Sequence, residues 1–260
     1  GAGSDLASLK MKAELAGDHY VVNGTKTWTT LGQHADWIFC LVRTRSDVAR
    51  RQEGISFLLI DMNSPGISLK PIILLDGTHE VNECHFDHVE VPVDNLVGEE
   101  GRGWSYGKVL LQHERTNSAN TFRSAYRLRK LREQAGRPVR GQRPLAEDPN
   151  FMRRLAAAEV ELKSLEYIEL RTLASVASGK APGPESSFLK LIGTEIQQNI
   201  DALYLDAAGY YSLPYRPEAP VGEDDEIYAA LRYFNYRKTT IFAGSNEIQR
   251  NIIAKHVLGL

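Results

Sequence analysis

The sequence predicts an α+β fold, in which a β-barrel-like domain at residues 1–100 is followed by a bundle of about four helices at residues 101–260. Two observations lead to this prediction. The first hundred residues contain short apolar runs, several with the period-2 alternation of a half-buried strand. After the glycine-rich segment GEEGRG, residues 98–103, the apolar period lengthens to about 3.6 residues, as in an amphipathic helix.

The expected β domain begins with a hairpin. HYVVNGTKTW, residues 19–28, places Asn23-Gly24 between two alternating runs, and this dipeptide favours the positive φ angles of a tight turn. Further strands are expected in short apolar or alternating stretches, namely WIFCLV at 37–42, ISFLLIDM at 55–62 and HFDHVEVPV at 85–93.

The helical domain is expected to open with one long helix at residues 104–134, which carries apolar side chains on one side and Arg and Lys on the other. Loops rich in proline and glycine separate the later helices. These helices are expected at 151–178, 186–208 and 226–256, the last of them interrupted at TTIFAGSNEI, residues 239–248.

Composition excludes several classes of protein. The 260 residues are 42% hydrophobic and 25% charged, with a net charge of −2, as is typical of a globular protein. No apolar run reaches the roughly 18 residues of a membrane span, and no His/Cys spacing indicates a metal site. Cys40 and Cys84 lie in strand-like stretches, which indicates reduced, buried thiols and a cytoplasmic location.

Four segments occur along the chain: GAGSD at 1–5, NGTKTWTTLGQHADW at 23–37, FDHVEVPVDNLVGEEGRGW at 86–104 and IFAGSNEIQRNIIAKHVLG at 241–259. In this order and approximate spacing they resemble the middle and C-terminal domains of the acyl-CoA dehydrogenase family. LLQHERT and APGPESSFLKL are similar to the large subunits of its pimeloyl-CoA and steroid-degrading members. The resemblance implies that the family's helical N-terminal domain is missing and that the chain starts inside a motif.

The resemblance also implies FAD as the cofactor and assigns its first contacts to a KxWxT motif. In that motif Trp28 packs against the flavin ring and Thr30 hydrogen-bonds its edge, which an indole and a hydroxyl can do. Taken alone, the two residues indicate only a strand with a core tryptophan and a surface threonine. Ser4 matches a serine that the family places near the flavin and the CoA chain.

A second motif departs from the family. Many members carry a catalytic glutamate in a Tyr-Glu-Gly-Thr-like turn, which here reads FAGS at residues 242–245. Alanine cannot take a proton, but the Ala243 N–H can still donate to a thioester oxygen, and Gly244 is expected beside the substrate. The flavin neighbours in this motif are expected to be Ser245, Asn246 and Gln249. Without the resemblance, SNEIQRN indicates a helix start capped by serine.

A subset of the family carries its base on the helix after the β domain, directly before an arginine. Glu114 of HERT matches that position, and nearby leucines favour the partial desolvation that a general base needs. Arg115 is expected to bind the CoA portion. By itself Glu114 is typical of a solvated helix residue. His113 cannot pair with it, because adjacent helix residues point in different directions.

These assignments predict FAD-dependent α,β-dehydrogenation of an acyl-CoA, in which Glu114 takes the α proton and the β carbon passes hydride to flavin N5. An electron-transfer flavoprotein is the expected acceptor. In tetrameric members two further motifs bind the FAD of a neighbouring subunit, and both are weak here, at 136–149 and 204–211. Their weakness suggests a heteromer in which a sister subunit supplies the missing contacts, and the resemblance implies a homo- or heterotetramer.

Two other functions stay open at this point. The alanine at the position of the usual base also fits a non-catalytic subunit that completes the site of another chain. In addition, residues 101–180 hold 16 Lys and Arg against 8 Asp and Glu, a basic block that could face nucleic acid. The block lacks the interleaved aromatics of a nucleic-acid binder, so CoA phosphates or solvent are the preferred interpretation.

Overall fold

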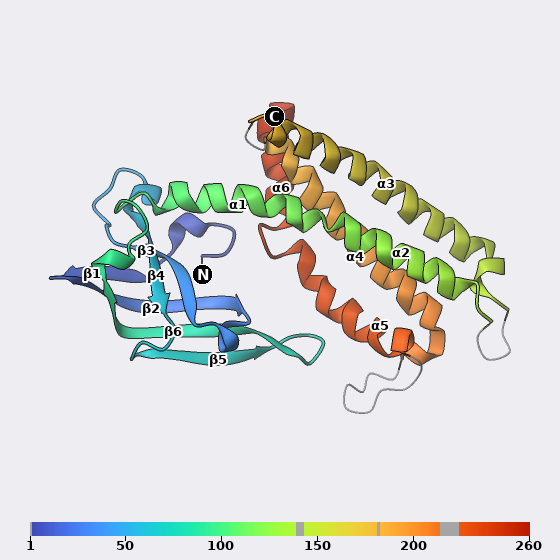
Figure 1. The fold of residues 1–260 in the computed structure, drawn as a ribbon, viewed down its shortest axis with the longest axis horizontal. Helices are drawn as coiled ribbons and strands as arrows, with labels where there is room; N and C mark the ends of the chain where they lie inside the picture. The colour runs from blue at the N-terminus through green and yellow to red at the C-terminus, as the bar shows by residue number, and fades with distance from the viewer. Residues whose placement is uncertain (1, 139–142, 181–182, 214–223) are drawn as a thin grey trace. The chain divides into compact units, whose positions relative to one another are not determined.

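The computed structural model describes residues 2–138, 143–180, 183–213 and 224–260, without the side chains of residues 111–118, 185 and 224–227. Contacts divide the chain into two units, Gly1–Leu111 and Gln112–Leu260. The first unit is built on a six-stranded sheet and the second on helices, so the predicted α+β fold is confirmed (Figure 1). Helix α1, Gly103–Ala119, begins in the first unit and ends in the second.

The strands of the first unit form one sheet with the order β4-β3-β1-β2-β6-β5. Neighbouring strands are antiparallel except β1 and β3, which are parallel. Strands β4 and β6 also contact each other, although they are not neighbours in the strand order. The strands are β1 Lys12–Ala16, β2 His19–Thr30, β3 Trp37–Arg43, β4 Ile55–Asp61, β5 Ile67–Ile73 and β6 His79–Pro92.

Aliphatic side chains of alternate strand positions pack into the core of the first unit, and its fully buried members include Val22, Val42, Leu58, Ile60 and Val89. Cys40 and Cys84 belong to the same core and are free, as predicted. Burial raises the pKa of the Cys40 thiol to about 12. The thiol is therefore protonated and unreactive at neutral pH.

The prediction of a hairpin at Asn23-Gly24 is wrong. Strand β2 runs through both residues, and the turn lies at residues 17–18, between β1 and β2. Instead, the pairing of β2 with β6 shifts register at Asn23 and Gly24. At this shift the Asn23 side chain accepts a hydrogen bond from the His88 N–H at 2.8 Å. Gly24 has φ 145°, and a Cβ there would lie 2.9 Å from the Met11 Cα. The glycine is needed because β2 bends close to the chain entering β1.

Replacement of Gly24 by alanine is expected to lower the free energy of unfolding by about 2–3 kcal/mol, because the new Cβ meets both an unfavourable φ and the Met11 backbone. Gly17→Ala is the matched control: Gly17 also has a positive φ, but open space surrounds it, so a loss of about 1 kcal/mol is expected. Urea unfolding of both variants measures the difference. If both variants lose the same free energy of unfolding, the contact of the new Cβ with Met11 adds no strain.

The long helix expected at residues 104–134 is two helices. Helix α1 ends at Ala119 and α2, Thr121–Ala135, follows, because Asn120 between them adopts the left-handed conformation with φ 52°. The joint lies close to α4, Ser187–Ala208: a Cβ on Gly193 would be 2.7 Å from the Ala119 carbonyl oxygen. Asparagine tolerates this conformation better than most residues, which places the break here.

Helix α4 is central to the second unit, because it packs against α2, α3, α5 and α6. The described residues contain six α-helices, α1 included. The helices expected at 151–178 and 186–208 and the interruption before the last helix are confirmed. The remaining helices are α3 Pro149–Ala177, α5 Asp224–Asn235 and α6 Asn246–Ile253.

Candidate functional site

Trp28 lies near the end of β2 in a strained backbone conformation. The pairing of β2 with β6 shifts register between Thr27 and Thr29, and Trp28 at the shift has φ 70°. A positive φ is rare for a bulky residue and is retained where the surroundings impose it, most often at functional sites. The Trp28 side chain is 64% exposed, and Thr30 is exposed as well. The tryptophan expected to contact flavin is therefore a surface residue, whereas the competing interpretation placed it in a core.

A buried asparagine stabilises the register shift at Trp28. Asn82 of β6 is 1% exposed, and its amide donates to the Thr29 carbonyl at 3.1 Å and to Gln33 Oε1 at 2.6 Å. The His79 ring contacts Asn82 Oδ1 through Nε2 at 2.7 Å. Asn82 was not predicted as a site residue, although it is a polar residue at an inward position of an alternating strand, which was a signal for it.

The second motif forms the turn that leads into α6. Ala243 has φ 52° and Gly244 φ 79°, and the Ser245 side chain then caps α6 by accepting from the Ile248 N–H at 3.4 Å. The Gln249 amide reaches back and donates to the Gly244 carbonyl at 3.2 Å. A Cβ on Gly244 would lie 2.6 Å from that amide nitrogen. The structure thus brings together the expected residues of this motif, with a glycine of positive φ at its centre.

Lys190 of α4 lies beneath the start of α6 and was not identified from the sequence. Its side chain is fully buried, and its Nζ donates to Asn246 Oδ1 at 2.8 Å. Thr194, one turn further along α4, donates to the same oxygen at 3.2 Å. Asn246 is itself 2% exposed. Burial lowers the pKa of Lys190 to about 8, with a small opposing effect of Glu247. Asn246 therefore anchors the turn to α4.

The free energy of unfolding of the wild type, relative to that of Lys190→Met, is expected to increase as the pH rises from about 8 to about 10.5. In this range the unfolded chain binds more protons at residue 190 than the folded chain, so deprotonation favours the folded state. Methionine removes this titration. Urea unfolding at several pH values in this range measures the change. Lys180 is exposed, so Lys180→Met is the control. A difference that is constant with pH contradicts the prediction.

Two features test whether these residues fit a flavin. The Gln249 Oε1 atom is buried and accepts no hydrogen bond within the described ranges, and buried acceptors normally have a partner. An N–H or O–H of a bound cofactor can supply one. In the other unit, the exposed Trp28 indole offers a surface on which a planar ring can stack. Both features fit a planar cofactor with polar edges.

The remaining expected residues are placed as follows. Ser4 is exposed and precedes the short helix η1, Leu6–Ser8. Glu114 and Arg115 lie on α1, but their side chains fall outside the described residues. The weak motif at 136–149 contains residues 139–142, which lie outside the described residues. The weak motif at 204–211 covers the end of α4 and the start of η7, Gly209–Ser212.

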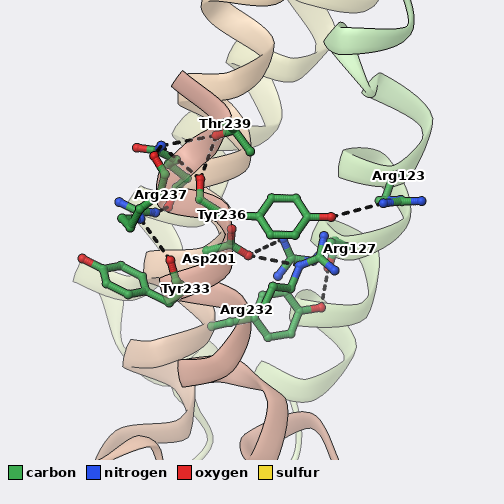
Figure 2. Close-up of polar contacts among 10 residues, drawn as sticks. Arg123, Arg127, Asp201, Arg232, Tyr233, Tyr236, Arg237 and Thr239 are labelled. Carbon is green, nitrogen blue, oxygen red and sulfur yellow. Dashed lines mark hydrogen bonds and ion pairs between the residues drawn. The ribbon is translucent and has the colours of Figure 1, made fainter. Parts of the chain in front are cut away.

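A buried ion cluster lies in the helical unit and was not predicted. Figure 2 shows the Asp201 carboxylate of α4 between Arg127 of α2, at 2.5 Å, and Arg232 of α5, at 3.3 Å. The Asp201 side chain is fully buried. Each guanidinium also lies over an aromatic ring, Arg127 over Tyr204 and Arg232 over Tyr236, at 4.7 and 4.1 Å. The cluster therefore joins three helices through one carboxylate.

No group of three or more His, Cys, Asp or Glu side chains among the described residues could hold a metal ion. The described helices also include none that combines the length and the apolar character needed to cross a membrane.

Comparison with known proteins identifies similar domains and relatives. The family model "Acyl-CoA dehydrogenase, middle domain" matches residues 1–89, and "Acyl-CoA dehydrogenase, C-terminal domain" matches residues 101–258. Acyl-CoA dehydrogenase IpdE1 of Mycobacterium tuberculosis is 38% identical over 262 residues, which cover 100% of this chain and 64% of that protein.

Solved structures are similar over the whole chain. The ChsE4-ChsE5 complex from Mycobacterium tuberculosis matches with a TM-score of 0.84 and 33% identity, over 100% of this chain and 66% of the other. The Tcur3481-Tcur3483 steroid ACAD matches with a TM-score of 0.88 and 28% identity over the same shares. The chain spans 64–66% of the lengths of these three proteins.

Proposed function

Because this chain belongs to the acyl-CoA dehydrogenase family, we propose that the protein to which it contributes converts an acyl-CoA thioester to the 2-enoyl-CoA with FAD as its cofactor. The similarity to a steroid ACAD supports a bulky acyl group. The small Ala243 side chain, in a turn where many members carry glutamate, is consistent with such a group.

The observation that carries the proposal is the backbone of that turn. Ala243 keeps φ 52° although it is neither glycine nor asparagine, and this conformation costs about 1–2 kcal/mol. Its N–H donates to no acceptor in the part of the chain that the structure describes. A strained turn with a free donor is suited to hold the thioester oxygen as negative charge develops on it. The oxygen-binding role thus survives the loss of the carboxylate.

In the proposed mechanism Glu114 removes the α proton, and Arg115 binds the CoA portion. Ala243 donates its N–H to the thioester oxygen, and this hydrogen bond lowers the pKa of the α carbon. Gly244 lies beside the same oxygen. Trp28 and Thr30 would contact the flavin ring, and Ser245, Asn246 and Gln249 are the FAD contacts proposed for the second motif. When bound, FAD supplies the acceptor for the hydride from the β carbon.

The proposed partners are a sister subunit and an electron-transfer flavoprotein. The similarity to a structure named as a complex of two chains, ChsE4 and ChsE5, supports a heteromer. The weak motifs at residues 136–149 and 204–211 support it as well, since a second type of chain then supplies the missing contacts.

The test is anaerobic reduction of the enzyme-bound flavin. The full-length protein is purified alone and with the product of a neighbouring dehydrogenase gene, its FAD content is measured, and bleaching is followed with linear, cyclic and steroid-side-chain CoA thioesters. Bound FAD that one class of thioester bleaches supports the proposal. FAD that no thioester bleaches, or a failure to retain FAD in every pairing, contradicts it and favours the non-catalytic subunit, for which the alanine at position 243 is the specific observation.

A further inference from the structure

The turn that contains Ala243 is bound to α4 on both of its sides. Before the turn the chain forms the short helix η8, Tyr236–Thr240, and after it α6 begins at Asn246. Ala243 therefore lies three residues from each of these ends. The residues of α4 that bind the two ends are Gln198 and Lys190. They are eight positions apart, a spacing that places both on one side of a helix.

Gln198 holds the chain before the turn. Its side-chain Nε2 donates to the carbonyls of Tyr236 and Arg237 in η8, both at 3.2 Å. Arg237 binds back, because its guanidinium donates to the Gln198 carbonyl at 3.2 Å. The same guanidinium donates to the Tyr233 carbonyl of α5 at 3.1 Å (Figure 2). Helix η8 is thus joined to α4 by hydrogen bonds in both directions.

Two backbone hydrogen bonds carry this constraint toward Ala243. The Ile241 and Phe242 N–H groups both donate to the Lys238 carbonyl of η8, at 2.9 and 3.1 Å. Ala243 follows directly, and its N–H has no acceptor within the described parts of the chain. The N–H that the proposed mechanism uses is therefore the next one after a stretch of backbone whose amides are fixed.

Lys190 holds the chain after the turn, through its hydrogen bond to Asn246 Oδ1 at 2.8 Å. Both residues are buried. Another link between α4 and α6, the pair of Glu195 with Arg250 at 2.5 Å, joins side chains that are about half exposed. Water competes with an exposed pair and much less with a buried hydrogen bond. The buried link therefore constrains the start of α6 more strongly.

We propose that Gln198 and Lys190 are positioning residues, which clamp the turn from its two sides and so keep the Ala243 N–H in place for the thioester oxygen. The proposal rests on the proposed function, which gives that N–H its role. Ala243 and Gly244 both have positive φ angles, and a strained conformation persists only where the surroundings impose it. Release of either side lets the turn relax. A displacement of about 1 Å at a catalytic group costs about 100-fold in rate.

The test measures kcat and KM of the FAD-loaded full-length protein after Gln198→Met or Lys190→Met. Methionine keeps a side chain of similar length but donates no hydrogen bond. Each variant is expected to lower kcat for an acyl-CoA by a factor of about 10–100, with KM and FAD content near those of the wild type, since the affected hydrogen bond strengthens in the transition state. The double variant is expected to lose less than the product of the two factors, because either change releases the same turn.

Glu195→Gln is the matched control, because it breaks an exposed link from the same helix to α6, and it is expected to leave kcat unchanged. Unchanged kcat in both Gln198→Met and Lys190→Met overturns the clamp. A variant whose lower rate follows entirely from lost FAD also overturns it, because the residue then acts on the flavin and not on the turn.

Backbone hydrogen exchange separates the clamp from the function on which it rests. Peptides that cover residues 239–246 are expected to exchange faster in Gln198→Met and Lys190→Met than in the wild type, while those of α3 stay unchanged. A wild type that no thioester bleaches contradicts the proposed function, and faster exchange confined to residues 239–246 still supports the clamp. Exchange that is unchanged there, or that rises equally in α3, overturns the clamp even in an active enzyme.

Discussion

Replacement of Glu114 by glutamine is expected to slow the bleaching of bound flavin by a good acyl-CoA substrate by a factor of about 10²–10⁴. Glutamine keeps the size and shape of glutamate but cannot accept the α proton. Substrate binding does not depend on that proton transfer, so the affinity for the thioester and the FAD content are expected to stay near those of the wild type. Stopped-flow measurement of flavin absorbance under anaerobic conditions provides the rate.

A second variant tests whether the base can move between the two positions that the family uses. Addition of Ala243→Glu to Glu114→Gln restores a carboxylate at the turn, and part of the lost rate is expected to return. Glutamate at position 243 must adopt the positive φ that alanine has there, which limits the recovery. Glu133→Gln, a change at a half-exposed residue of α2 paired with Lys130 and Arg129, is the matched control and is expected to have no effect. A Glu114→Gln enzyme that bleaches as fast as the wild type refutes the assignment of the base.

The change from period-2 to period-3.6 patterning was sufficient to predict the two structural classes along the chain, because burial on one face imposes these periods. Local turn chemistry was less reliable. Asn23-Gly24 has the residue types of a hairpin turn, yet the glycine lies inside a strand. There it leaves room for the Met11 backbone, which packs against it. The bend at Asn120 likewise depends on a helix from a distant part of the sequence, α4 with its Gly193.

The site residues were predicted from a resemblance and not from the pattern of side chains. No periodicity indicates that Trp28 and Ala243 have positive φ angles, since the conformations follow from a strand register and a helix cap. Buried polar residues were equally hidden. In the sequence, Lys190 and Asp201 look like ordinary charged positions of an amphipathic helix, and only the packing of α4 on every side buries them.

Asp201 is expected to be the most sensitive charged position for the stability of the helical unit. Asp201→Ala removes the one carboxylate between Arg127 and Arg232, and both guanidinium groups are then left without a counter-charge in a largely buried place. Breaking a buried pair in this way typically costs about 3–5 kcal/mol. The free energy of unfolding, from urea denaturation followed by circular dichroism, is expected to fall by that amount.

Asp206 provides the matched control for Asp201, because it lies on the same helix and also pairs with an arginine, Arg154, at 2.6 Å. Both side chains of that pair are about half exposed. Solvent screens their attraction, so Asp206→Ala is expected to cost about 1 kcal/mol or less. If the two variants lose the same stability, burial gives the Asp201 cluster no special role. If Asp201→Ala alone is strongly destabilised, the joining of α2, α4 and α5 through one carboxylate holds α4 in place. Lys190 of α4 then anchors Asn246 at the start of α6, and with it the proposed oxygen-binding turn.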